Sequence, residues 1–519
     1  MAAQRLPIGI QTFREIREEG YYYVDKTPHI HKLIEGAKHY FLSRPRRFGK
    51  SLLLDTIKEL FEGNERLFQG LVIHEHWDWS VRHPTLRLSF AVGDFKEPGG
   101  LVGHISDQLM TLETAAGITA RRSTLGGRLL HLISELHRET GQPVALLVDE
   151  YDKPILDALD APEVARRNRD MLRGIYSVIK DADEHLRFSF LTGVSKFSKV
   201  SLFSGVNNLL DITLDPENAT ICGYTEEDLE QVFGRELEGL DKARVRDWYN
   251  GYCWRGDKRV YNPFDILLLF KRREFSPWWF ETGTPTFLVD LLTSRRVPSL
   301  ALDSLIAGDS LLSKFDVDDI ATEALLFQTG YLTITGEVDQ PGKRFYRLGF
   351  PNLEVRQGLN DHLLAWMVRN HSHREANSAK LIPLLIAEDF QGLETLVGAF
   401  YASIPSEWLS SSNNTIANYE GYYASVFYSY FAAVGLDITV EDSSIKGRAD
   451  MCVRVGSNVL LFEFKVVEQA GIGSALAQLR EKGYADKYAS ADGKVYLVGV
   501  EFSSEARSVV GFEVESVGQ

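Results

Sequence analysis

Short apolar runs alternate with longer amphipathic stretches between about residues 39 and 215. The runs HYFLS, TLRLSF, VALLVDE, RFSFLTGV and NLLDITL have the length and composition of buried strands. Helical spacing marks the stretches between them, one of which begins at Lys50 and another of which spans 163–181. Buried strands that alternate with helices predict a parallel sheet with crossover helices, which is an α/β architecture.

The pattern changes after residue 222. Residues 223–300 are helical and rich in aromatic residues, as in YTEEDLEQVFG and NPFDILLLF, and they predict a helical lid on the first domain. Residues 301–365 run from helices into the strands YLTI and FYRLGF around a glycine-containing turn, which favours a winged-helix-like unit. Residues 366–415 are expected to form a helical connector that ends in the linker-like stretch SSSNNT.

A further group of strands and helices follows this linker. The pattern predicts a helix at 417–434, strands near 437–441, 448–455 and 458–467, a helix at 473–489 and a final strand KVYLVGVEF. We therefore expect a separate α/β domain at 416–519, in addition to the first domain at 1–222.

Composition restricts the classes of function. The chain of 519 residues has a net charge of −15, which argues against a general attraction to nucleic acid, so any such contact must be local. The cysteines Cys222, Cys253 and Cys452 are far apart and predict neither a disulfide framework nor a zinc site. Since no run is long and apolar enough for a signal peptide or a membrane span, a cytoplasmic protein without membrane association is expected.

The segment RPRRFGKS follows an apolar strand and opens a helix, which is the context of a phosphate-binding loop, or P-loop. Backbone amides at a helix start attract phosphate oxygens, Lys50 can reach the β and γ phosphates, and the Ser51 hydroxyl can bind Mg²⁺. Arg44 stands where the usual motif has its first glycine, and a partial match alone is also typical of a helix cap. The loop residues expected to contact the nucleotide are Arg46, Arg47, Phe48, Gly49, Lys50, Ser51 and Leu52.

Two carboxylates end the apolar run VALLVDE, about 100 residues after the loop. Asp149 is expected beside the phosphate-bound Mg²⁺, and Glu150 can act as the base for the attacking water. The alternative is that both acids only cap a strand. After the next strand, Thr192, Ser195 and Lys196 are placed either to sense the γ phosphate or to serve as ordinary loop residues. Together the two motifs predict binding and hydrolysis of a nucleoside triphosphate.

Near the C-terminus, charged residues interrupt apolar strands, which is costly unless they are paired or bind metal. A two-residue turn at Ser457-Asn458 would place Asp450 opposite Lys465 and bring Asp450, Glu463 and Lys465 to one face of the sheet. Two carboxylates on one face favour a divalent metal site, and a nearby lysine can stabilise charge that develops on a phosphate.

Two further polar residues extend this cluster. Glu420 shares an otherwise apolar helical face with Ala424, Phe427 and Phe431, and Gln478 lies on the later helix, where it can help to hold the site. The alternative is a set of surface salt bridges, with Glu420 at a helix start that favours negative charge. We interpret the cluster as a metal-dependent phosphodiester site with Glu420, Asp450 and Glu463 as metal ligands.

The whole chain resembles a mostly uncharacterised family of proteins with an N-terminal AAA-ATPase-like domain and a C-terminal PD-(D/E)XK nuclease-like domain. The motifs that carry the resemblance include YYYVDKT, YFLSRPRRFGKSLLLDTIKELFEG, LLVDEYDKPI, LTGVSKFS, WYNGYCWRGDKRVYNPFDI, GRADMCV, LFEFKV and ALAQLREKGYADKY. RPRRFGKS is the usual form of the loop in this family, so the resemblance implies that Arg44 is a family trait.

The resemblance assigns roles to the same residues. It implies that Lys50 and Ser51 bind nucleotide phosphate and Mg²⁺, and that Asp149 and Glu150 form the Walker B pair. It implies a restriction-endonuclease-like centre made of Glu420, Asp450, Glu463 and Lys465, with support from Gln478 and Tyr484. Tyr23, Asp25 and Lys26 match another motif of the family; they either line the nucleotide base or pack the N-terminal segment, and we favour packing.

These observations predict an ATP-binding and ATP-hydrolysing protein whose nucleotide state gates a nuclease that uses Mg²⁺ or Mn²⁺ on DNA or RNA. The alternative from another class is a non-cutting ATPase switch that acts through partner binding or oligomerisation. A plain NTPase with an unrelated C-terminal domain is the third hypothesis. The sequence leaves ATP versus GTP and homo-oligomer versus monomer open.

Overall fold

The protein forms two compact units in the computed structural model. The first unit contains Met1–Gly283 and Ile306–Asn352, and the second contains Thr284–Leu305 and Leu353–Gln519. The chain therefore passes from one unit to the other three times. The residues that the structure describes are 4–196, 202, 208–283, 288, 291–292, 295, 297, 299–303, 305–312, 321–367, 371–402, 419–444, 447–488, 492–506 and 508–517.

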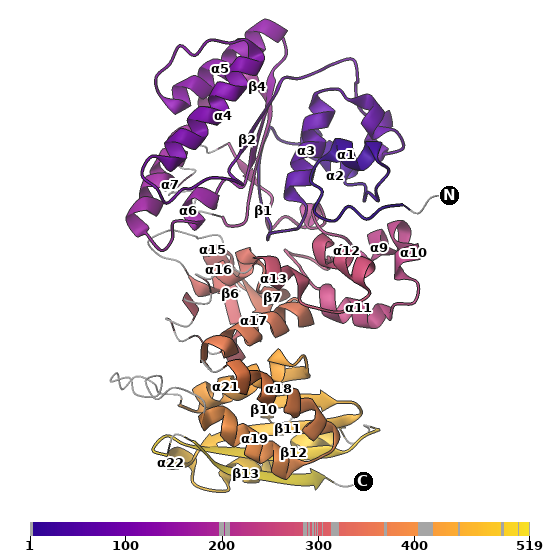
Figure 1. Ribbon diagram of the computed structural model, residues 1–519, viewed down its shortest axis with the longest axis vertical. Helices are drawn as coiled ribbons and strands as arrows, with labels where there is room; N and C mark the ends of the chain where they lie inside the picture. The colour runs from indigo at the N-terminus through magenta and orange to yellow at the C-terminus, as the bar shows by residue number, and fades with distance from the viewer. Residues whose placement is uncertain are drawn as a thin grey trace. The chain divides into compact units, whose positions relative to one another are not determined.

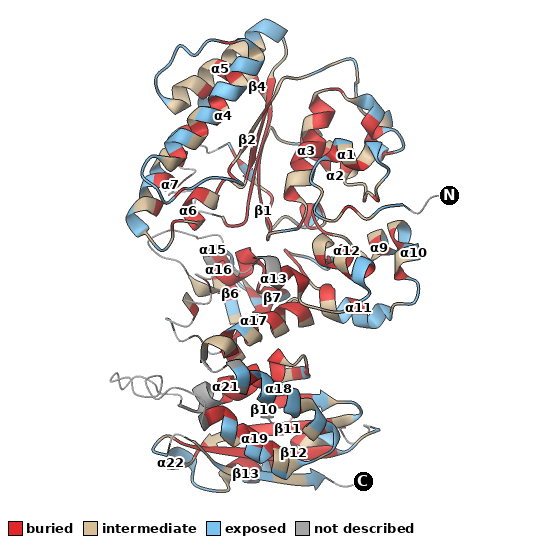
Figure 2. Cartoon of the chain, viewed as in Figure 1, coloured by how far each residue is buried: buried red, intermediate tan, exposed pale blue. Residues whose placement is uncertain are grey.

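A five-stranded parallel sheet forms the centre of the first unit, which confirms the predicted α/β class (Figure 1). The order β2-β3-β4-β1-β5 places β4 between the strand that precedes the P-loop and the strand that ends in the acidic pair. Every residue of β1 and β3 is buried, because helices cover both faces of the sheet (Figure 2). The strands are β1 His39–Ser43, β2 Thr85–Ser89, β3 Val144–Asp149, β4 Leu186–Gly193 and β5 Leu210–Asp211.

Helices pack on the two sides of this sheet, with α4, α5 and α7 on one side and α1, α2 and α3 on the other (Figure 1). The α-helices are α1 Phe13–Glu18, α2 Thr27–Glu35, α3 Lys50–Phe61, α4 Gly100–Ala116, α5 Leu125–Thr140, α6 Lys153–Leu156, α7 Pro162–Tyr176 and α8 Val178–Asp181. Short 3₁₀ helices are η1 Glu65–Phe68, η2 Val72–Glu75, η3 Asp183–His185 and η4 Pro216–Asn218.

The region after residue 222 is helical up to Gly283, and its role as a lid stays a prediction. A capping box between Thr225 and Asp228 starts its first helix, and Asn262 caps the helix that begins at Pro263. An apolar core joins these helices to Tyr22 and Val24 of the N-terminal segment. The lid helices are α9 Glu226–Val232, α10 Gly234–Leu237, α11 Lys242–Tyr249, α12 Pro263–Arg272 and α13 Trp278–Gly283.

A small three-stranded sheet, in the order β6-β8-β7, completes the first unit together with two helices. The antiparallel pair of β7 and β8 corresponds to the two strands expected around the glycine-containing turn. The elements are β6 Leu305–Gly308, α15 Asp309–Leu312, α16 Thr322–Thr329, β7 Thr333–Gln340 and β8 Lys343–Gly349.

The second unit contains a mixed sheet in the order β13-β12-β11-β10-β9, in which only β11 and β12 are parallel among the described pairs. One face packs against α19 and α21, and the other packs against α23. The elements are η5 Ser299–Asp303, α17 Leu353–Met367, α18 His371–Ile386, α19 Phe390–Ala402, α21 Tyr419–Ala433, β9 Asp437–Ser444, β10 Gly447–Val455, β11 Asn458–Val466, α22 Val467–Ala470, α23 Ser474–Lys482, η6 Tyr484–Tyr488, β12 Val495–Ser503 and β13 Ser508–Val517.

The short segment η5 is part of the core of this second unit. The hydroxyls of Ser299 and Ser429 are hydrogen-bonded at 2.8 Å, and the Tyr428 hydroxyl donates to Asp303 at 2.8 Å. Arg356 also forms an ion pair with Asp303 at 3.3 Å. The second unit is thus assembled from two separate stretches of the chain.

The predicted hairpin register between β10 and β11 was wrong by two residues. Val455 pairs with Asn458, so the turn consists of Gly456 and Ser457. Gly456 has φ 59°, the left-handed conformation that a hairpin turn with glycine at its first central position requires. Continued by one residue beyond Met451–Phe462, this register places Asp450 opposite Glu463 rather than opposite Lys465.

Two further details of the second unit differ from the expectation. The helix expected at 473–489 ends at Lys482, because Gly483 adopts a left-handed conformation that terminates it. The strand β13 was not expected from the sequence. Among the helices that the structure describes, none combines the length and the apolar character that a membrane span requires.

Candidate functional site

The P-loop lies between the end of β1 and the start of α3. Arg47 and Gly49 both have left-handed φ angles, of 70° and 90°, so the backbone curls before the helix begins at Lys50. The Lys50 ammonium is buried and donates to the carbonyl oxygens of Arg44 at 2.8 Å and Pro45 at 2.7 Å. Burial lowers the pKa of Lys50, and the nearby carboxylate of Glu150 opposes that shift.

A cavity of ≈ 490 Å³ opens directly in front of this loop. All seven loop residues predicted to contact nucleotide, Arg46 to Leu52, line it, and Glu150 lines it as well. Its size lies within the range typical of sites for small organic ligands and cofactors. The loop therefore faces an open space and not a packed core.

Arg44, which replaces the first glycine of the usual motif, is fully buried and is not among the described residues that line the cavity. Its guanidinium donates to the carbonyl oxygens of Ser43, Thr213 and Asn218, and it lies 4.2 Å from the ring centre of Trp254. Burial lowers the pKa of Arg44 to about 10. Arg44 thus anchors the back of the loop instead of contacting the phosphate side.

Three aromatic residues of the region predicted as a lid, Tyr252, Trp254 and Trp279, contact the P-loop directly. The Phe48 ring packs edge-on against Tyr252 at 4.8 Å and Trp254 at 5.2 Å between ring centres. The Trp279 indole N–H donates to the carbonyl oxygen of Arg46 at 3.1 Å. The region predicted as a lid is therefore in direct contact with the loop that forms the predicted phosphate site.

The two acids at the end of β3 have different environments. Asp149 is buried; its Oδ2 pairs with Arg87 Nη2 at 2.9 Å, and its Oδ1 accepts from the Thr192 hydroxyl at 3.2 Å. Glu150 instead lines the cavity and has a left-handed φ of 52°. The pKa of Glu150 is raised, mainly because the carboxyl group is buried. The positive charge of Lys50 opposes this shift, and the negative charge of Asp149 adds to it. Arg87 was not singled out from the sequence, since it lies in a strand that carries no motif.

The loop after β4 is held by a buried carboxylate. The Asp152 carboxylate accepts a hydrogen bond from the backbone N–H of Val194. It also accepts two from Ser195, one from the backbone N–H and one from the hydroxyl, each at 2.6 Å. A Cβ added at Gly193 would lie only 2.3 Å from Asp152 Oδ1, so glycine is needed for this approach. Ser195 and Lys196 are thus engaged within the protein, Lys196 by its N–H to Gln328 Oε1 at 2.9 Å.

The N-terminal segment forms another wall of the cavity, to which Tyr22, Tyr23 and Lys26 contribute. Lys26 pairs with Asp228 of the lid at 2.8 Å, while Asp25 accepts from the backbone N–H groups of Thr27 and Val72. We favoured packing from the sequence, and this holds for Asp25. Tyr23 and Lys26, however, line the cavity, because the segment folds back over the P-loop.

In the second unit, the structure brings together four of the predicted nuclease residues. Glu463 is buried, its Oε1 accepts from the Gln478 amide, and the same oxygen pairs with Lys465 Nζ at 3.1 Å. Asp450 Oδ2 accepts from the backbone N–H of Phe464 at 2.9 Å. By strand alternation, Asp450, Glu463 and Lys465 share the face of the sheet that packs on α23.

The predicted third carboxylate, Glu420, belongs to α21, but its side chain lies outside the described residues. Within the described part of the chain, no three acidic, histidine or cysteine side chains form a group that could hold a metal ion. The two carboxylates of Asp450 and Glu463 offer the oxygen ligands that Mg²⁺ and Mn²⁺ prefer, so they fit such an ion in type. Tyr484 is buried in the core under this face.

Comparison with known proteins supports both predicted kinds of domain. Residues 7–203 match a family described as predicted AAA-ATPase, and residues 418–512 match the PD-(D/E)XK nuclease superfamily. An uncharacterized protein in the vnfD 5' region of Azotobacter chroococcum mcd 1 is 57% identical over 520 residues, which cover 100% of both chains. The chain belongs to the AAA-ATPase-like family with a C-terminal PD-(D/E)XK nuclease domain.

The AAA-ATPase-like match includes the P-loop, Asp149, Glu150 and Thr192, and the nuclease match includes Asp450, Glu463, Lys465 and Gln478. In the PD-(D/E)XK nuclease domain, Glu501 is a residue that we did not single out from the sequence. It is buried on β12, and its carboxylate accepts from the backbone N–H of Gly473 at 2.9 Å and of Ala475 at 3.2 Å. Glu501 therefore fixes the start of α23, the helix that carries Gln478.

We expect Glu501→Gln to loosen the start of α23 and to weaken the hold of Gln478 on Glu463. Loss of charge-assisted hydrogen bonds to a buried carboxylate costs about 1–3 kcal/mol, measured as the free energy of unfolding in urea. Any metal-dependent cleavage by the nuclease domain should fall with it. Glu468→Gln is the control, because the exposed carboxylate of Glu468 also accepts hydrogen bonds, from the Ser503 hydroxyl and the Ser504 N–H, away from α23. Equal effects of both changes on cleavage would contradict this role.

Proposed function

We propose that this protein binds ATP with Mg²⁺ in the cavity at the P-loop and hydrolyses it, and that its C-terminal domain cleaves phosphodiester bonds of nucleic acid with Mg²⁺ or Mn²⁺ under the control of the nucleotide. The observation that carries the proposal is the placement of Lys50, Ser51 and Glu150 on one open cavity. The family membership supports ATPase and nuclease domains in general.

The residues around the cavity fit a triphosphate with its metal. Lys50 is positive and lies at the base of the loop, where it can leave the carbonyl oxygens that it now contacts and meet the β and γ phosphates. Ser51 and Asp149 offer oxygen ligands to Mg²⁺, which neutralises charge on the phosphates when it is bound. The nucleoside would then lie against the wall that contains Tyr23 and Lys26.

Glu150 is the proposed base that removes a proton from the attacking water. It lines the cavity, and burial raises its pKa. An ionised Glu150 therefore accepts a proton more readily than an exposed glutamate would. The base must be ionised to act, so hydrolysis should fall as the pH drops through this raised pKa.

The proposed nuclease centre uses Asp450 and Glu463 as metal ligands. Lys465, which contacts Glu463, would stabilise the charge that develops on the phosphate or orient the attacking water. Gln478, on helix α23, donates a hydrogen bond to the Glu463 carboxylate. Glu420 is proposed as a further ligand on the basis of its position in the sequence.

Control by the nucleotide is proposed from connections inside the first unit and along the chain. The loop after β4 reaches Gln328 of α16, and the lid reaches the P-loop through Trp254 and Trp279. Three chain crossings then join the first unit to the second. Closure of the lid on ATP would pull on these crossings, which gives a covalent route for the nucleotide state to reach the nuclease domain.

The test is a cleavage assay on single-stranded DNA, double-stranded DNA and RNA, with Mg²⁺ or Mn²⁺ and with or without ATP or GTP. We expect Glu150→Gln to retain ATP binding and to lose about 10²–10⁴-fold in ATP hydrolysis, and its cleavage rate should stay at the ATP-bound level. Glu97→Gln, an exposed change, is the control. Absence of cleavage under every condition, with ATP hydrolysis intact, would favour the non-cutting ATPase switch.

A further inference from the structure

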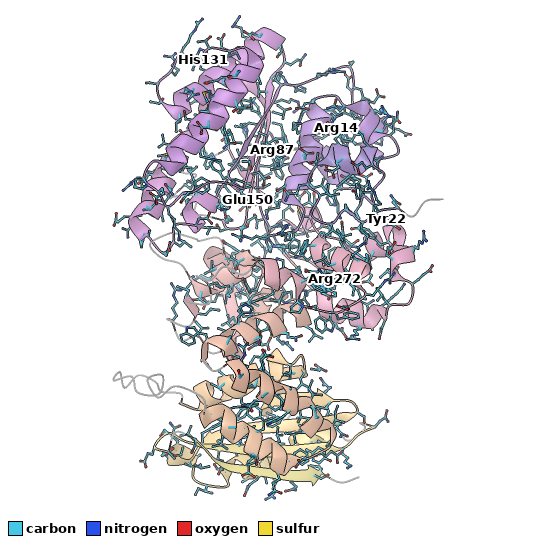
Figure 3. All side chains as sticks on the ribbon, viewed as in Figure 1. Arg14, Tyr22, Arg87, His131, Glu150 and Arg272 are labelled. Carbon is cyan, nitrogen blue, oxygen red and sulfur yellow. The ribbon has the colours of Figure 1, made fainter. Side chains whose placement is uncertain are left out.

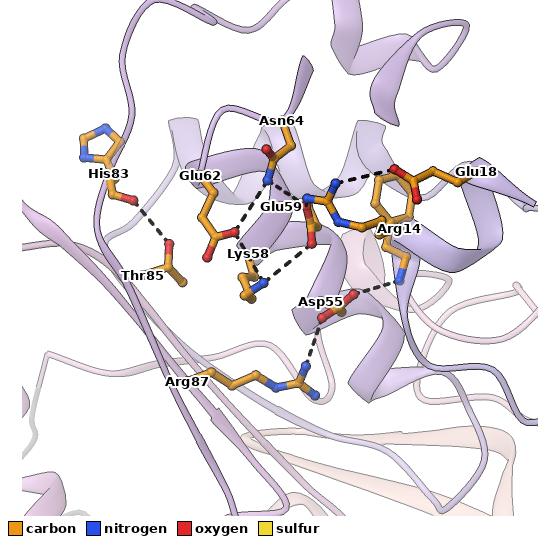
Figure 4. Close-up of polar contacts among 11 residues, drawn as sticks. Arg14, Glu18, Asp55, Lys58, Glu59, Glu62, Asn64, His83, Thr85 and Arg87 are labelled. Carbon is orange, nitrogen blue, oxygen red and sulfur yellow. Dashed lines mark hydrogen bonds and ion pairs between the residues drawn. The ribbon is translucent and has the colours of Figure 1, made fainter. Parts of the chain in front are cut away.

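Arg87 joins two buried carboxylates that come from different elements of the first unit. Its Nη1 contacts Asp55 Oδ1 on α3 at 3.1 Å, and its Nη2 contacts Asp149 Oδ2 at the end of β3 at 2.9 Å (Figure 4 shows the contact with Asp55). The side chains of Asp55 and Asp149 are only 10% and 3% exposed. Because each guanidinium nitrogen serves a different acid, Arg87 is a bridge between the P-loop helix and the acidic strand.

Both oxygens of the Asp149 carboxylate have a partner within the protein. Arg87 contacts Oδ2, while the Thr192 hydroxyl from the neighbouring strand β4 donates to Oδ1. These two contacts fix the rotation of a carboxylate that is proposed to face Mg²⁺. Arg87 lies beside Leu147 in the parallel pairing of β2 with β3, two residues before Asp149, and Figure 3 labels both Arg87 and Glu150.

The bridge continues from Asp55 to the N-terminal segment. Asp55 Oδ2 accepts from the backbone N–H of Phe13 at 2.7 Å, which is the first residue of α1. Ile16 of the same helix lines the cavity, as do Tyr23 and Lys26 farther along the segment. Hydrogen bonds and ion pairs thus connect the start of α1, a helix whose Ile16 lines the cavity, through Asp55 and Arg87 to Asp149.

We propose that Arg87 is a positioning residue for ATP hydrolysis: it holds the Asp149 carboxylate in the orientation that meets Mg²⁺ and couples that orientation to the N-terminal wall of the cavity through Asp55. This inference rests on the proposed function of the cavity. It assigns no direct contact with the nucleotide to Arg87, whose effect passes through Asp149. Partners that orient metal ligands typically change metal affinity or activity by about 10–100-fold when they are removed.

Three substitutions separate orientation from simple loss of packing. Arg87→Gln removes the positive charge and both ion pairs, whereas Arg87→Lys keeps a single charge that can serve one acid at a time. Asp55→Asn keeps the size of Asp55 but weakens the bridge at its far end. Arg128→Gln is the matched control, because Arg128 forms a similarly buried ion pair with Glu113 at 2.6 Å between α5 and α4.

The experiment is a Mg²⁺ titration of ATP hydrolysis by the full-length protein, together with binding of a fluorescent ATP analogue in EDTA. For Arg87→Gln we expect the Mg²⁺ concentration at half-maximal hydrolysis to rise by about 10–100-fold, while analogue binding without Mg²⁺ and the KM for Mg²⁺-ATP at saturating Mg²⁺ change little. Arg87→Lys and Asp55→Asn should give smaller rises, and Arg128→Gln none, although it lowers the melting temperature.

A Mg²⁺ requirement that is unchanged or lower in Arg87→Gln would overturn the inference, and a lower one would show that the guanidinium competes with the metal. If Arg87→Gln does not fold, unchanged Mg²⁺ requirements in both Arg87→Lys and Asp55→Asn would overturn it equally. A wild-type protein that neither binds nor hydrolyses ATP would refute the proposed function of the cavity instead.

Discussion

Replacement of Lys50 by alanine should abolish binding of Mg²⁺-ATP and reduce its hydrolysis by at least about 10²–10³-fold, the cost of one lost charge-stabilising donor in an active site. The reason is that Lys50 is the buried cation at the centre of the loop that lines the cavity. ATP binding by isothermal calorimetry and phosphate release both report the loss. The same change removes the two hydrogen bonds to the carbonyl oxygens of Arg44 and Pro45, so the nucleotide-free protein should also unfold at a lower temperature.

Lys58→Ala is the control for this prediction, since Lys58 lies on the same helix and pairs with Glu59 and Glu62 away from the cavity. Normal affinity for Mg²⁺-ATP in Lys50→Ala, with the fold intact, would show that the cavity is not a triphosphate site.

Asp450→Ala and Lys465→Ala should each reduce cleavage of nucleic acid by at least about 10²-fold and leave ATP binding unchanged. Asp450 supplies one of the two carboxylates proposed as metal ligands, and Lys465 supplies the positive charge that contacts Glu463. The measurement is metal-dependent cleavage of a labelled oligonucleotide, with analogue binding to the P-loop measured on the same preparation.

A charged residue of the same domain provides the control. Lys494 pairs with Glu388 at 2.6 Å, and Lys494→Ala should lose that exposed ion pair without an effect on cleavage. Wild-type cleavage by both Asp450→Ala and Lys465→Ala would remove the nuclease assignment altogether.

The fold and the P-loop could be predicted because their signals are local. A fully buried strand, a loop with Gly49 and Lys50, and a helix follow one another within 23 residues of sequence from His39 to Phe61, and each step has its own pattern. The same holds for VALLVDE, in which burial on both faces of the sheet produces a continuous apolar run. The predicted five-part division of the chain, by contrast, stays a prediction.

The nuclease face illustrates why a wrong register still gave the right grouping. A shift of two residues changes which residues are opposite each other but keeps every side chain on its own face of the sheet. Asp450, Glu463 and Lys465 therefore share a face in the structure, although Asp450 opposes Glu463 and not Lys465. A shift of one residue would have separated them.

The residues that the sequence did not reveal act through contacts between distant parts of the chain. Arg87 lies 62 residues from Asp149, and nothing in TLRLSF distinguishes its arginine from one exposed at a sheet surface. Glu501 resembles an interruption of an apolar strand until α23 is docked onto it. Tyr23 and Lys26, for which packing was favoured over a place beside the nucleotide, line the cavity because the N-terminal segment folds over the loop.

The segment Ser299–Asp303 limits how the molecule can be divided for study. A C-terminal fragment that begins at residue 353 or later would lack Ser299, the hydrogen-bond partner of Ser429, and would lack Asp303, to which Tyr428 donates. Both contacts are made inside the second unit. In such a fragment the buried hydroxyls of Ser429 and Tyr428 would therefore lack these partners, which destabilises the fold. Expression of the isolated PD-(D/E)XK nuclease domain therefore requires that residues 299–303 be added to the fragment, or that the full-length chain be used.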